Sequence, residues 1–425
     1  MITALIITVF IGGYIAIAFE HPLKINKAAS ALITGVLCWT IYMLQSESAN
    51  AVSDELLHHL GEISSILFFL LGAMTIVELI DSHGGFEIIT RKISTTSKTR
   101  LLFIITAITF FLSALLDNLT TAIVMTSLCT KILNEKEDRL WFAGMIVIAA
   151  NAGGAWSPLG DVTTTMLWIG GQITALNIMK VLILPSMLAC IIPALIIAFR
   201  FMGAKFILMP QSLSTFKERK DGKIILFSGV GFLIFVPVFK TLTHLPPFMG
   251  MLLALGLMWV ITTIIHKNTP EEDAKQLTVG KALQKIDTPS ILFFLGILLA
   301  VSALQSIGVL ASLATFLSGT LKNDYLIGIS LGLLSALVDN VPLVAASQGM
   351  YSLSTYPTDH PFWEFLALTT GTGGSAIIIG SAAGVAVMGI EHINFMWYLK
   401  KISWLALIGF VAGILVFLLQ LQLIN

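Results

Sequence analysis

The sequence predicts an all-α polytopic membrane protein with inverted structural repeats, two re-entrant hairpins and two broken helices. Three observations lead to this prediction: the apolar composition, the uneven distribution of basic residues between the loops, and motifs that each occur twice. Of the 425 residues, 56% are hydrophobic and only 11% are charged, whereas soluble domains carry roughly 25% charged residues. A soluble chain of this length cannot bury so much apolar surface, so most of it is expected to lie in lipid.

Apolar segments follow one another along the whole chain, and ten of them fit single membrane crossings. A helix needs about 20 apolar residues to span the bilayer. The first segment has no basic n-region and no small-residue cleavage pattern, so we expect it to be retained. The predicted spans lie near residues 2–19, 28–45, 61–80, 141–170, 181–200, 224–240, 248–265, 290–308, 362–388 and 402–424.

Two further apolar segments, residues 101–133 and 325–354, are too long for one helix and too short for two crossings. In the first, the arms on either side of a central Asp-Asn pair have about 16 and 15 residues. At 1.5 Å per residue such an arm reaches only about 24 Å, whereas the hydrocarbon core is roughly 30 Å thick. An arm of this length enters the membrane and turns back, so both segments are predicted to be re-entrant hairpins.

The basic residues test this arrangement. With both segments as hairpins, the loops on one side of the membrane hold all of the 24 Lys and Arg residues except Lys180, Lys240 and Lys322. Counting the first hairpin as a single crossing would destroy this asymmetry. By the positive-inside rule the basic side is the cytoplasm. We therefore expect a multi-pass protein of the inner (plasma) membrane with both termini in the periplasm.

Three pairs of short segments match each other at offsets between 220 and 225 residues. They are residues 113–118 (SALLDN) with 335–340 (SALVDN), 66–70 with 291–295 (both ILFFL), and the Gly-Gly pairs at 153–154 and 373–374. Chance similarity between apolar helices explains the Phe-Leu runs but not the Asp-Asn pairs. The sequence therefore indicates an internal duplication.

The two repeats are predicted to be inverted, because one hairpin enters from the cytoplasm and the other from the periplasm. In such architectures the substrate binds near the bilayer midplane, at the ends of discontinuous helices. The predicted division is 1–60 for N-terminal transmembrane helices, 61–223 for the first transport repeat, 224–288 for connecting transmembrane helices, and 289–425 for the second, inverted transport repeat.

The carboxylates of the two Asp-Asn pairs are the first candidates for chemistry. Asp117 and Asp339 lie in the middle of apolar segments, where such residues usually serve ion or proton paths because an unpaired charge there is costly. The structural alternative is that each Asp caps a helix, with Asn118 or Asn340 filling a turn. Both interpretations hold together, because the end of a helix is itself an ion site.

The second candidate element is a stretch rich in glycine in the middle of a span, residues 151–165 (NAGGAWSPLGDVTTT). Its glycines and Pro158 are expected to break the helix, so that polar side chains line the break. The alternative is an ordinary flexible kink. The matching stretch, residues 370–381, keeps the glycines and hydroxyls, but Ser381 stands where the first repeat has Asp161.

No Arg or Lys lies in these motifs. A dicarboxylate or phosphate site needs a cation or several helix N-termini with free amides, so the pattern favours a hard cation such as Na⁺, which takes oxygen ligands. Buried acids of this kind also take up protons, so one set of carboxylates serves for exchange. The candidate Na⁺ ligands are Asp117, Asn118, Asn151, Ser157, Asp161, Thr163, Thr164, Ser335, Asp339, Asn340, Thr372 and Ser375.

The sequence contains no sign of an enzyme or of a cofactor. It has no Walker motif, no GxGxxG after a strand and no HExxH. The expected partners are the lipid bilayer, Na⁺ and H⁺, with no nucleic acid. The three cysteines, Cys38, Cys129 and Cys190, fall in apolar runs and are expected to be buried packing residues. The acids expected to be solvated at span ends are Glu62, Glu78, Asp81, Glu364 and Glu391.

At residues 113–121 (SALLDNLTT) and 151–164 (NAGGAWSPLGDVTT) the sequence resembles the NhaD-type sodium/proton antiporters of the ion transporter superfamily. The resemblance runs from about residue 60 to the C-terminus. It implies efflux of Na⁺, often Li⁺, against entry of H⁺, and a homodimer held by scaffold helices. The functional residues that it implies are Asp117, Asn118, Asn151, Asp161, Thr163, Thr164, Ser335, Asn340 and Ser375.

One departure from the repeat pattern is that Pro342 follows the second Asp-Asn pair where Thr120 follows the first. The leading hypothesis is a secondary active antiporter that exchanges cytoplasmic Na⁺ or Li⁺ for external H⁺ through buried carboxylates by alternating access. Arsenite and dicarboxylate carriers share the scaffold, so the second hypothesis is an anion or arsenite carrier coupled to Na⁺ or H⁺. An ion channel or a membrane enzyme has no motif in its support.

Overall fold

The computed structural model describes residues 2–90, 95–205, 220–267, 277–337 and 339–424, and every named element in these ranges is a helix. Eight of the described helices are long and apolar enough to cross a membrane: α3 (Lys27–Gln45), α4 (Ala49–Ser82), α6 (Lys98–Leu116), α10 (Ala175–Arg200), α11 (Lys220–Thr243), α12 (Pro247–His266), α15 (Thr288–Ser306) and α22 (Ser403–Ile424). The prediction of an all-α, multi-pass membrane protein is therefore confirmed. The motif residue Val338 and the basic residues Arg91, Lys92, Lys217, Arg219 and Lys275 lie outside the described residues.

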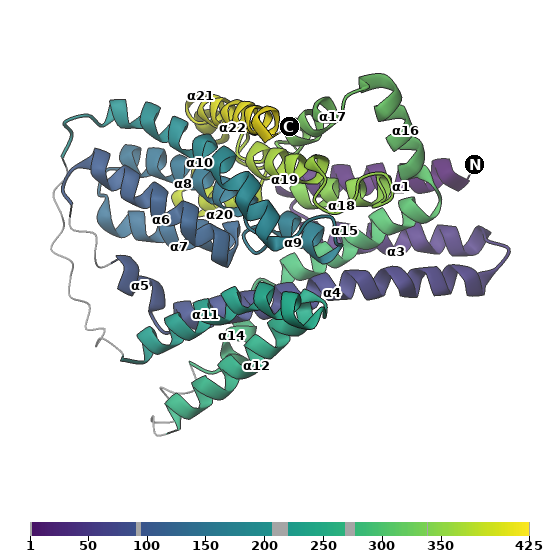
Figure 1. Ribbon diagram of the computed structural model, residues 1–425, viewed down its shortest axis with the longest axis horizontal. Coiled ribbons are helices and arrows are strands. Elements are labelled where there is room, and N and C mark those ends of the chain that lie inside the picture. The colour runs from purple at the N-terminus through teal and green to yellow at the C-terminus, as the bar shows by residue number, and fades with distance from the viewer. Residues whose placement is uncertain (1, 91–94, 206–219, 268–276, 338, 425) are drawn as a thin grey trace.

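The N-terminal helices pack against a helix from the second half of the chain. α1 (Ile2–Ala18) lies against α3, and α3 lies against α15, which also contacts α4. Figure 1 shows α3, α4 and α15 running side by side. The indole N–H of Trp39 in α3 donates to the carbonyl of Leu299 in α15, at 2.9 Å. α4 begins well before the span predicted at 61–80, because Ser48 caps it and the polar residues that follow are compatible with a helix.

Each predicted hairpin consists of two helices, the second of which begins at an Asp-Asn pair. α6 and α7 (Asn118–Ile132) meet at Asp117 and pack against each other. α17 (Asp324–Leu334) is followed after a short link by α18 (Asn340–Met350). The expectation of a first arm of about 16 residues was wrong: α6 has 19 residues, because Ser97 caps it and the helix starts at Lys98.

Both glycine-rich stretches interrupt a helix, as predicted. α8 (Lys136–Ala155) ends after the Gly-Gly pair, and α9 (Val162–Ile169) begins after a non-helical link. In the second half of the chain, α19 (Pro361–Gly373) ends at the equivalent Gly-Gly pair, and α20 (Ala382–Glu391) begins after residues 374–381. The breaks place the first turns of α9 and α20 inside the protein.

The Gly-Gly pairs allow two helices to approach a neighbouring backbone closely. A Cβ atom at Gly153 of α8 would lie 2.3 Å from the carbonyl oxygen of Phe110 in α6, and a Cβ atom at Gly373 of α19 would lie 2.1 Å from the carbonyl oxygen of Gly332 in α17. These separations leave no room for a side chain. Small residues at helix contacts are the usual means of close packing in a membrane, where the hydrophobic effect does not drive helices together.

The same two helix pairs share a second contact. The hydroxyl of Ser113 in α6 donates to the carbonyl of Ala150 in α8 at 2.6 Å. The hydroxyl of Ser335, which follows α17, donates to the carbonyl of Thr370 in α19 at 3.0 Å. These contacts join residues at matching positions of the duplicated motifs.

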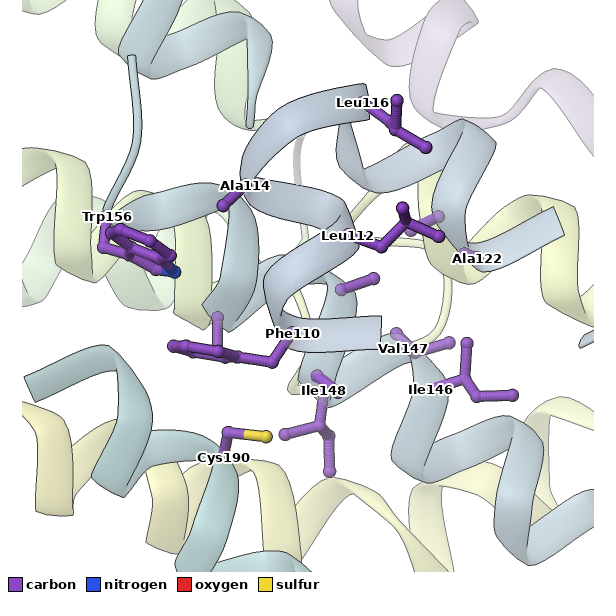
Figure 2. Packing of buried hydrophobic residues seen from close by; sticks show 14 of the residues in the cluster. Phe110, Leu112, Ala114, Leu116, Ala122, Ile146, Val147, Ile148, Trp156 and Cys190 are labelled. Atoms are coloured by element: carbon purple, nitrogen blue, oxygen red, sulfur yellow. The ribbon is translucent and has the colours of Figure 1, made fainter. Parts of the chain in front are cut away.

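Large apolar side chains surround the first break (Figure 2). The ring of Phe110 stacks on that of Trp156 in the link after α8, with centroids 5.8 Å apart and planes inclined by 17°. Ile148 of α8 and Cys190 of α10 lie in the same cluster. All three cysteines are buried and form no disulfide, which confirms the expectation that they are packing residues. The link between α8 and α9 is thus enclosed by apolar packing on this side.

The other helices enclose these elements. α10 packs along α22, while α11 packs along α12, which also contacts α4. Shorter helices join or flank the long ones: α2 (Glu20–Leu23), α5 (Gly85–Thr90), α14 (Val279–Lys285), α16 (Val309–Leu321) and α21 (Phe395–Lys401). Figure 1 shows α11 and α12 at the edge of the molecule, on the opposite side from α21 and α22.

The close approach of α8 to α6 predicts the effect of a single methyl group. Gly153→Ala should destabilise the protein by about 1–3 kcal/mol, the usual cost of overpacking, because the added carbon meets backbone rather than a movable side chain. Gly256→Ala in α12 is the control, since nothing lies within 4 Å of its Cβ position. Thermal unfolding in detergent compares the two variants. Equal melting temperatures for both would contradict the close packing described here.

Candidate ion-binding site

The carboxylate of Asp161 is the centre of a hydrogen-bond network that joins the interrupted helices. Asp161 caps α9, and its Oδ1 accepts from the backbone N–H and the hydroxyl of Thr163 at 2.9 and 2.8 Å. Its Oδ2 accepts from the amide of Asn118 in α7 at 2.6 Å and from the amide of Asn340 in α18 at 3.2 Å. Asp161 is only 2% exposed. Among the described residues, no Lys, Arg or His forms an ion pair with it.

These donors stabilise the charge of Asp161 without cancelling it. An ionised carboxylate only accepts hydrogen bonds, so both amides must turn their NH₂ groups toward it. A buried charge costs several kcal/mol, and each hydrogen bond to a charged group contributes about 1.5–3 kcal/mol. Two amides, one hydroxyl and one backbone N–H therefore offset part of the cost of burying this carboxylate in its charged form. Its negative charge remains available to a cation or a proton.

Asn151 of α8 extends the network into the second half of the chain. Its Oδ1 accepts from the amide of Asn118 at 3.2 Å, and its own amide donates to the hydroxyls of Ser375 and Ser381, both at 2.9 Å. Ser381 was not among the predicted ligands. The signal that identifies it is the alignment of the repeats, in which it occupies the position of Asp161. The network thus joins α7, α8, α9 and α18 to the link before α20.

Four helices begin around this network, and each is capped by a side chain of the chain itself. The caps of α7, α9, α18 and α20 are Asp117, Asp161, Asp339 and Ser381. Each accepts from a backbone N–H of its own helix. Such N-termini bind anions. Here three of the four anion positions are taken by carboxylates of the protein, so the site supplies its own negative charges.

Asp117 adjoins the network but forms no hydrogen bond with it. Its carboxylate accepts from the backbone N–H and the hydroxyl of Thr120, both at 2.8 Å. The backbone of Asp117 has φ 91° and ψ 155°, a conformation that costs about 1–3 kcal/mol for a residue other than glycine. The strain is concentrated where α6 turns into α7, directly before Asn118.

Asp339 also lies outside the Asp161 network, and it contacts a lysine side chain from another part of the chain. Its Oδ2 is 3.6 Å from Nζ of Lys27 at the start of α3. The motifs themselves contain no Lys or Arg, but the fold brings Lys27 from outside them to Asp339. The contact joins residues that are distant in the sequence, so no local sequence pattern predicts it.

The remaining predicted hydroxyl ligands donate to backbone carbonyls. Ser157 donates to Ala114, Thr164 to Asp161, Ser335 to Gly332 and Thr370, and Thr372 to Leu368. These bonds fix the links and helix ends around the site. In this arrangement the hydroxyls support the backbone, and the polar contacts of the carboxylate come from Asn118, Asn340 and Thr163.

Two of the acids expected to be solvated are buried. Glu391 at the end of α20 accepts from Arg139 of α8 at 3.1 Å, and Glu364 near the start of α19 accepts from the amide of Asn177 in α10. A partner from another helix makes burial possible in each case. Glu62 is exposed, as expected. Glu78 forms an ion pair with Lys285 at 3.1 Å.

A cavity of about 490 Å³ lies beside the site. It is lined by the first turns of α7 and α20, the last turns of α4, and the connections that precede α3 and α15. Thr120, which holds the carboxylate of Asp117, is one lining residue, and Lys27, which contacts Asp339, is another. The cavity therefore reaches residues in contact with both Asp-Asn pairs.

The sequence matches a family model described as "Citrate transporter" (CitMHS) over residues 14–371. The chain belongs to the CitMHS family. Within the family it is similar to sodium/proton antiporter 1 of Arabidopsis thaliana, with 47% identity over 407 residues, covering 96% of this chain and 70% of the relative. It is also similar to the Na⁺/H⁺ antiporter NhaD of Vibrio cholerae, with 31% identity over 448 residues, covering 97% and 90%.

These relatives confirm the resemblance to NhaD-type antiporters that the two motifs indicated. As a CitMHS protein the chain is a transporter and not an enzyme, and it uses no cofactor, because the ions that such proteins carry are substrates. The eight described helices that are long and apolar enough to cross a membrane agree with the assignment to a transporter family.

The geometry predicts that Asp117 and Asp161 of this CitMHS protein are both needed for cation transport. Asp161→Asn removes the charge at the centre of the network, and Asp117→Asn removes the adjacent one while keeping an oxygen that can cap α7. Each should weaken cation binding by at least about 2 kcal/mol, about 30-fold. Cation-dependent proton transport in everted vesicles measures the loss.

Asp54→Asn, at an exposed position of α4, is the matched control and should transport normally. Thermal unfolding of each variant separates loss of charge from loss of fold. Should Asp117→Asn and Asp161→Asn both transport at wild-type rates at every pH, the two carboxylates serve only as helix caps.

Proposed function

We propose that the chain is a secondary active antiporter that exchanges cytoplasmic Na⁺ or Li⁺ for external H⁺. The observation that carries this proposal is the buried, ionisable carboxylate of Asp161. Within the described ranges, the donors that hold it are neutral and come from both halves of the chain. The names of the antiporter relatives support the same ions. A group of this kind takes either a metal cation or a proton, and that choice is the basis of exchange.

The amides around Asp161 give a physical route for the two ions to compete. Asn118 and Asn340 direct NH₂ groups at the carboxylate, whereas a bound Na⁺ requires oxygen atoms. Rotation of these amides brings their Oδ1 atoms to the cation, beside the hydroxyl of Thr163. Protonation of the carboxylate also creates an O–H donor that needs an acceptor, so at least one amide must turn its oxygen toward Asp161 when either ion is bound.

Alternating access is part of the same proposal, and the matched contacts in the two halves of the chain support it. The matched contacts of Gly153 and Gly373, and those of Ser113 and Ser335, support an internal repeat. We propose that the α6–α7 and α17–α18 pairs are re-entrant hairpins from opposite sides of the membrane. The repeats are then inverted, with the divisions at residues 61–223 and 289–425 expected from the sequence. The segments 1–60 and 224–288 provide the remaining transmembrane helices.

The lining of the cavity beside the site supports a direction of access. It includes residues of the 285–290 connection, and Lys285 there is one of the basic residues of the predicted cytoplasmic side. We propose that this cavity is the cytoplasmic entry for Na⁺, in an inner membrane protein with both termini in the periplasm. A homodimer is part of the same proposal, as the NhaD resemblance implies.

A citrate or other anion carrier is the second candidate, and the description of the family model favours it. The helix N-termini argue against it. A bound anion would compete with Asp117, Asp161 and Asp339, whose carboxylates already accept from the first N–H groups of their helices. Two of these acids lack a cationic partner among the described residues. The site as built attracts cations.

The proposal predicts transport of Na⁺ in the absence of any organic anion. Purified protein in liposomes with an imposed pH gradient should dissipate that gradient when Na⁺ or Li⁺ is added, and Asp161→Asn should not. Liposomes without protein control for leakage. A response that requires citrate or arsenite would instead support the second candidate.

A further inference from the structure

The two Asp-Asn pairs are stabilised differently, and the difference follows from one change between the repeats. Asp117 accepts from both the backbone N–H and the hydroxyl of Thr120. The corresponding residue after Asp339 is Pro342, which has no backbone N–H and no hydroxyl. Asp339 keeps one backbone donor, and its other oxygen faces the ammonium group of Lys27, 3.6 Å away. The ammonium group of Lys27 therefore contacts Asp339 in the way that the hydroxyl of Thr120 contacts Asp117 in the first repeat.

Several contacts hold Lys27 in this position. It is the first residue of α3, where the positive end of the helix dipole disfavours a cation by about 0.3–1 kcal/mol. Its backbone N–H donates to the carboxylate of Glu20 at 3.2 Å, and its ammonium group lies 4.5 Å from the centre of the Phe293 ring. The side chains of Lys27 and Asp339 are only 26% and 17% exposed. The contacts of the ammonium group with Phe293 and Asp339 distinguish Lys27 from a lysine whose side chain extends into solvent.

The ion pair is directly connected to the ion site. Asn340, which follows Asp339 in the chain, donates to the carboxylate of Asp161. Lys27 lines the same cavity as Thr120. A cation that enters through this cavity therefore passes the positive charge of Lys27. The partner of Lys27, Asp339, is the residue directly before Asn340, whose amide binds Asp161. The charge of Lys27 must influence cation affinity unless Asp339 neutralises it.

We propose that Lys27 is a tethered counter-cation for Asp339. It removes the second-repeat carboxylate from ion exchange, so that Asp117 and Asp161 are the two acids that exchange Na⁺ for H⁺. Lys27 is then a positioning residue for the site, and Asp339 is not a direct ligand. This inference rests on the proposed antiport activity and specifies which carboxylates carry it.

The test compares four proteins in liposomes: wild type, Lys27→Met, Asp339→Asn and the double variant, with Lys24→Met as a control at an exposed position of the same connection. Asp339→Asn leaves a lysine unpaired beside the site and should raise the apparent KM for Na⁺ about tenfold. Lys27→Met leaves an additional carboxylate, so it should lower KM severalfold and slow turnover. In the double variant both charges are absent, and KM should return to within about twofold of wild type.

Lys27→Arg should keep the wild-type KM, because it retains the charge, and Lys24→Met should leave transport unchanged. A double variant that keeps the raised KM of Asp339→Asn would overturn the proposal, because Asp339 would then be a ligand itself. A Lys27→Met variant that matches Lys24→Met in KM and in turnover would overturn it too.

Thermal unfolding of the same four proteins gives a second readout that does not depend on transport. Removing one partner of a partly buried pair should lower the melting temperature, whereas removing both should restore much of it. Purely additive effects would overturn the pairing even if the wild-type protein carried an ion other than Na⁺. Failure of wild-type protein to exchange Na⁺ for H⁺ would instead count against the proposed function.

Discussion

The structure depends on accommodating one ionisable carboxylate, that of Asp161, inside a membrane protein. Burial makes its charged form costly, and neutral donors from several helices, rather than a neighbouring cation, offset part of that cost. A lysine or arginine in contact with Asp161 would form a permanent ion pair and leave nothing to exchange. Amides and hydroxyls stabilise the charge and still allow a mobile cation or a proton to take it.

The interrupted helices are the means by which these donors reach the carboxylate. A continuous helix directs its N–H groups at its own carbonyls, whereas a break inside the protein exposes the first N–H groups of a new helix. Four such helix starts surround the network. The breaks require backbone close to backbone, which explains why Gly153 and Gly373 have no space for a Cβ atom. Packing by small residues and binding by helix ends are therefore parts of one arrangement.

Local signals in the sequence predicted the features that depend on local chemistry. Gly-Gly pairs and Pro158 predicted the break after α8, and the Asp-Asn pairs predicted the starts of α7 and α18, because these residues act on the backbone next to them. The length of α6 was misjudged because its start depends on the cap by Ser97. Sequence reasoning placed Ser157 and Thr372 among the candidate ligands, and in the structure their hydroxyls donate to backbone carbonyls, which still leaves their oxygen lone pairs for a cation. A hydroxyl in a motif does not reveal its acceptor.

Contacts between distant segments were not predictable from the sequence. Nothing around Lys27 indicates that it meets Asp339, and nothing near Glu391 or Arg139 indicates that they pair. The match between the two halves of the sequence partly makes up for this missing information. A residue that can be assigned a role in one half points to the residue at the equivalent position of the other half. Ser381 could have been found in this way from Asp161, and the proline that replaces Thr120 could have indicated that Asp339 needs another donor.

The central claim is that Na⁺ and H⁺ compete for the carboxylate of Asp161. The most direct test is equilibrium binding of radioactive Na⁺ to the purified protein, with proton release recorded in the same weakly buffered solution. The account predicts that Na⁺ binding releases protons, that acidification displaces bound Na⁺, and that Asp161→Asn abolishes both effects. Na⁺ binding that releases no protons, or that persists in Asp161→Asn, would contradict it.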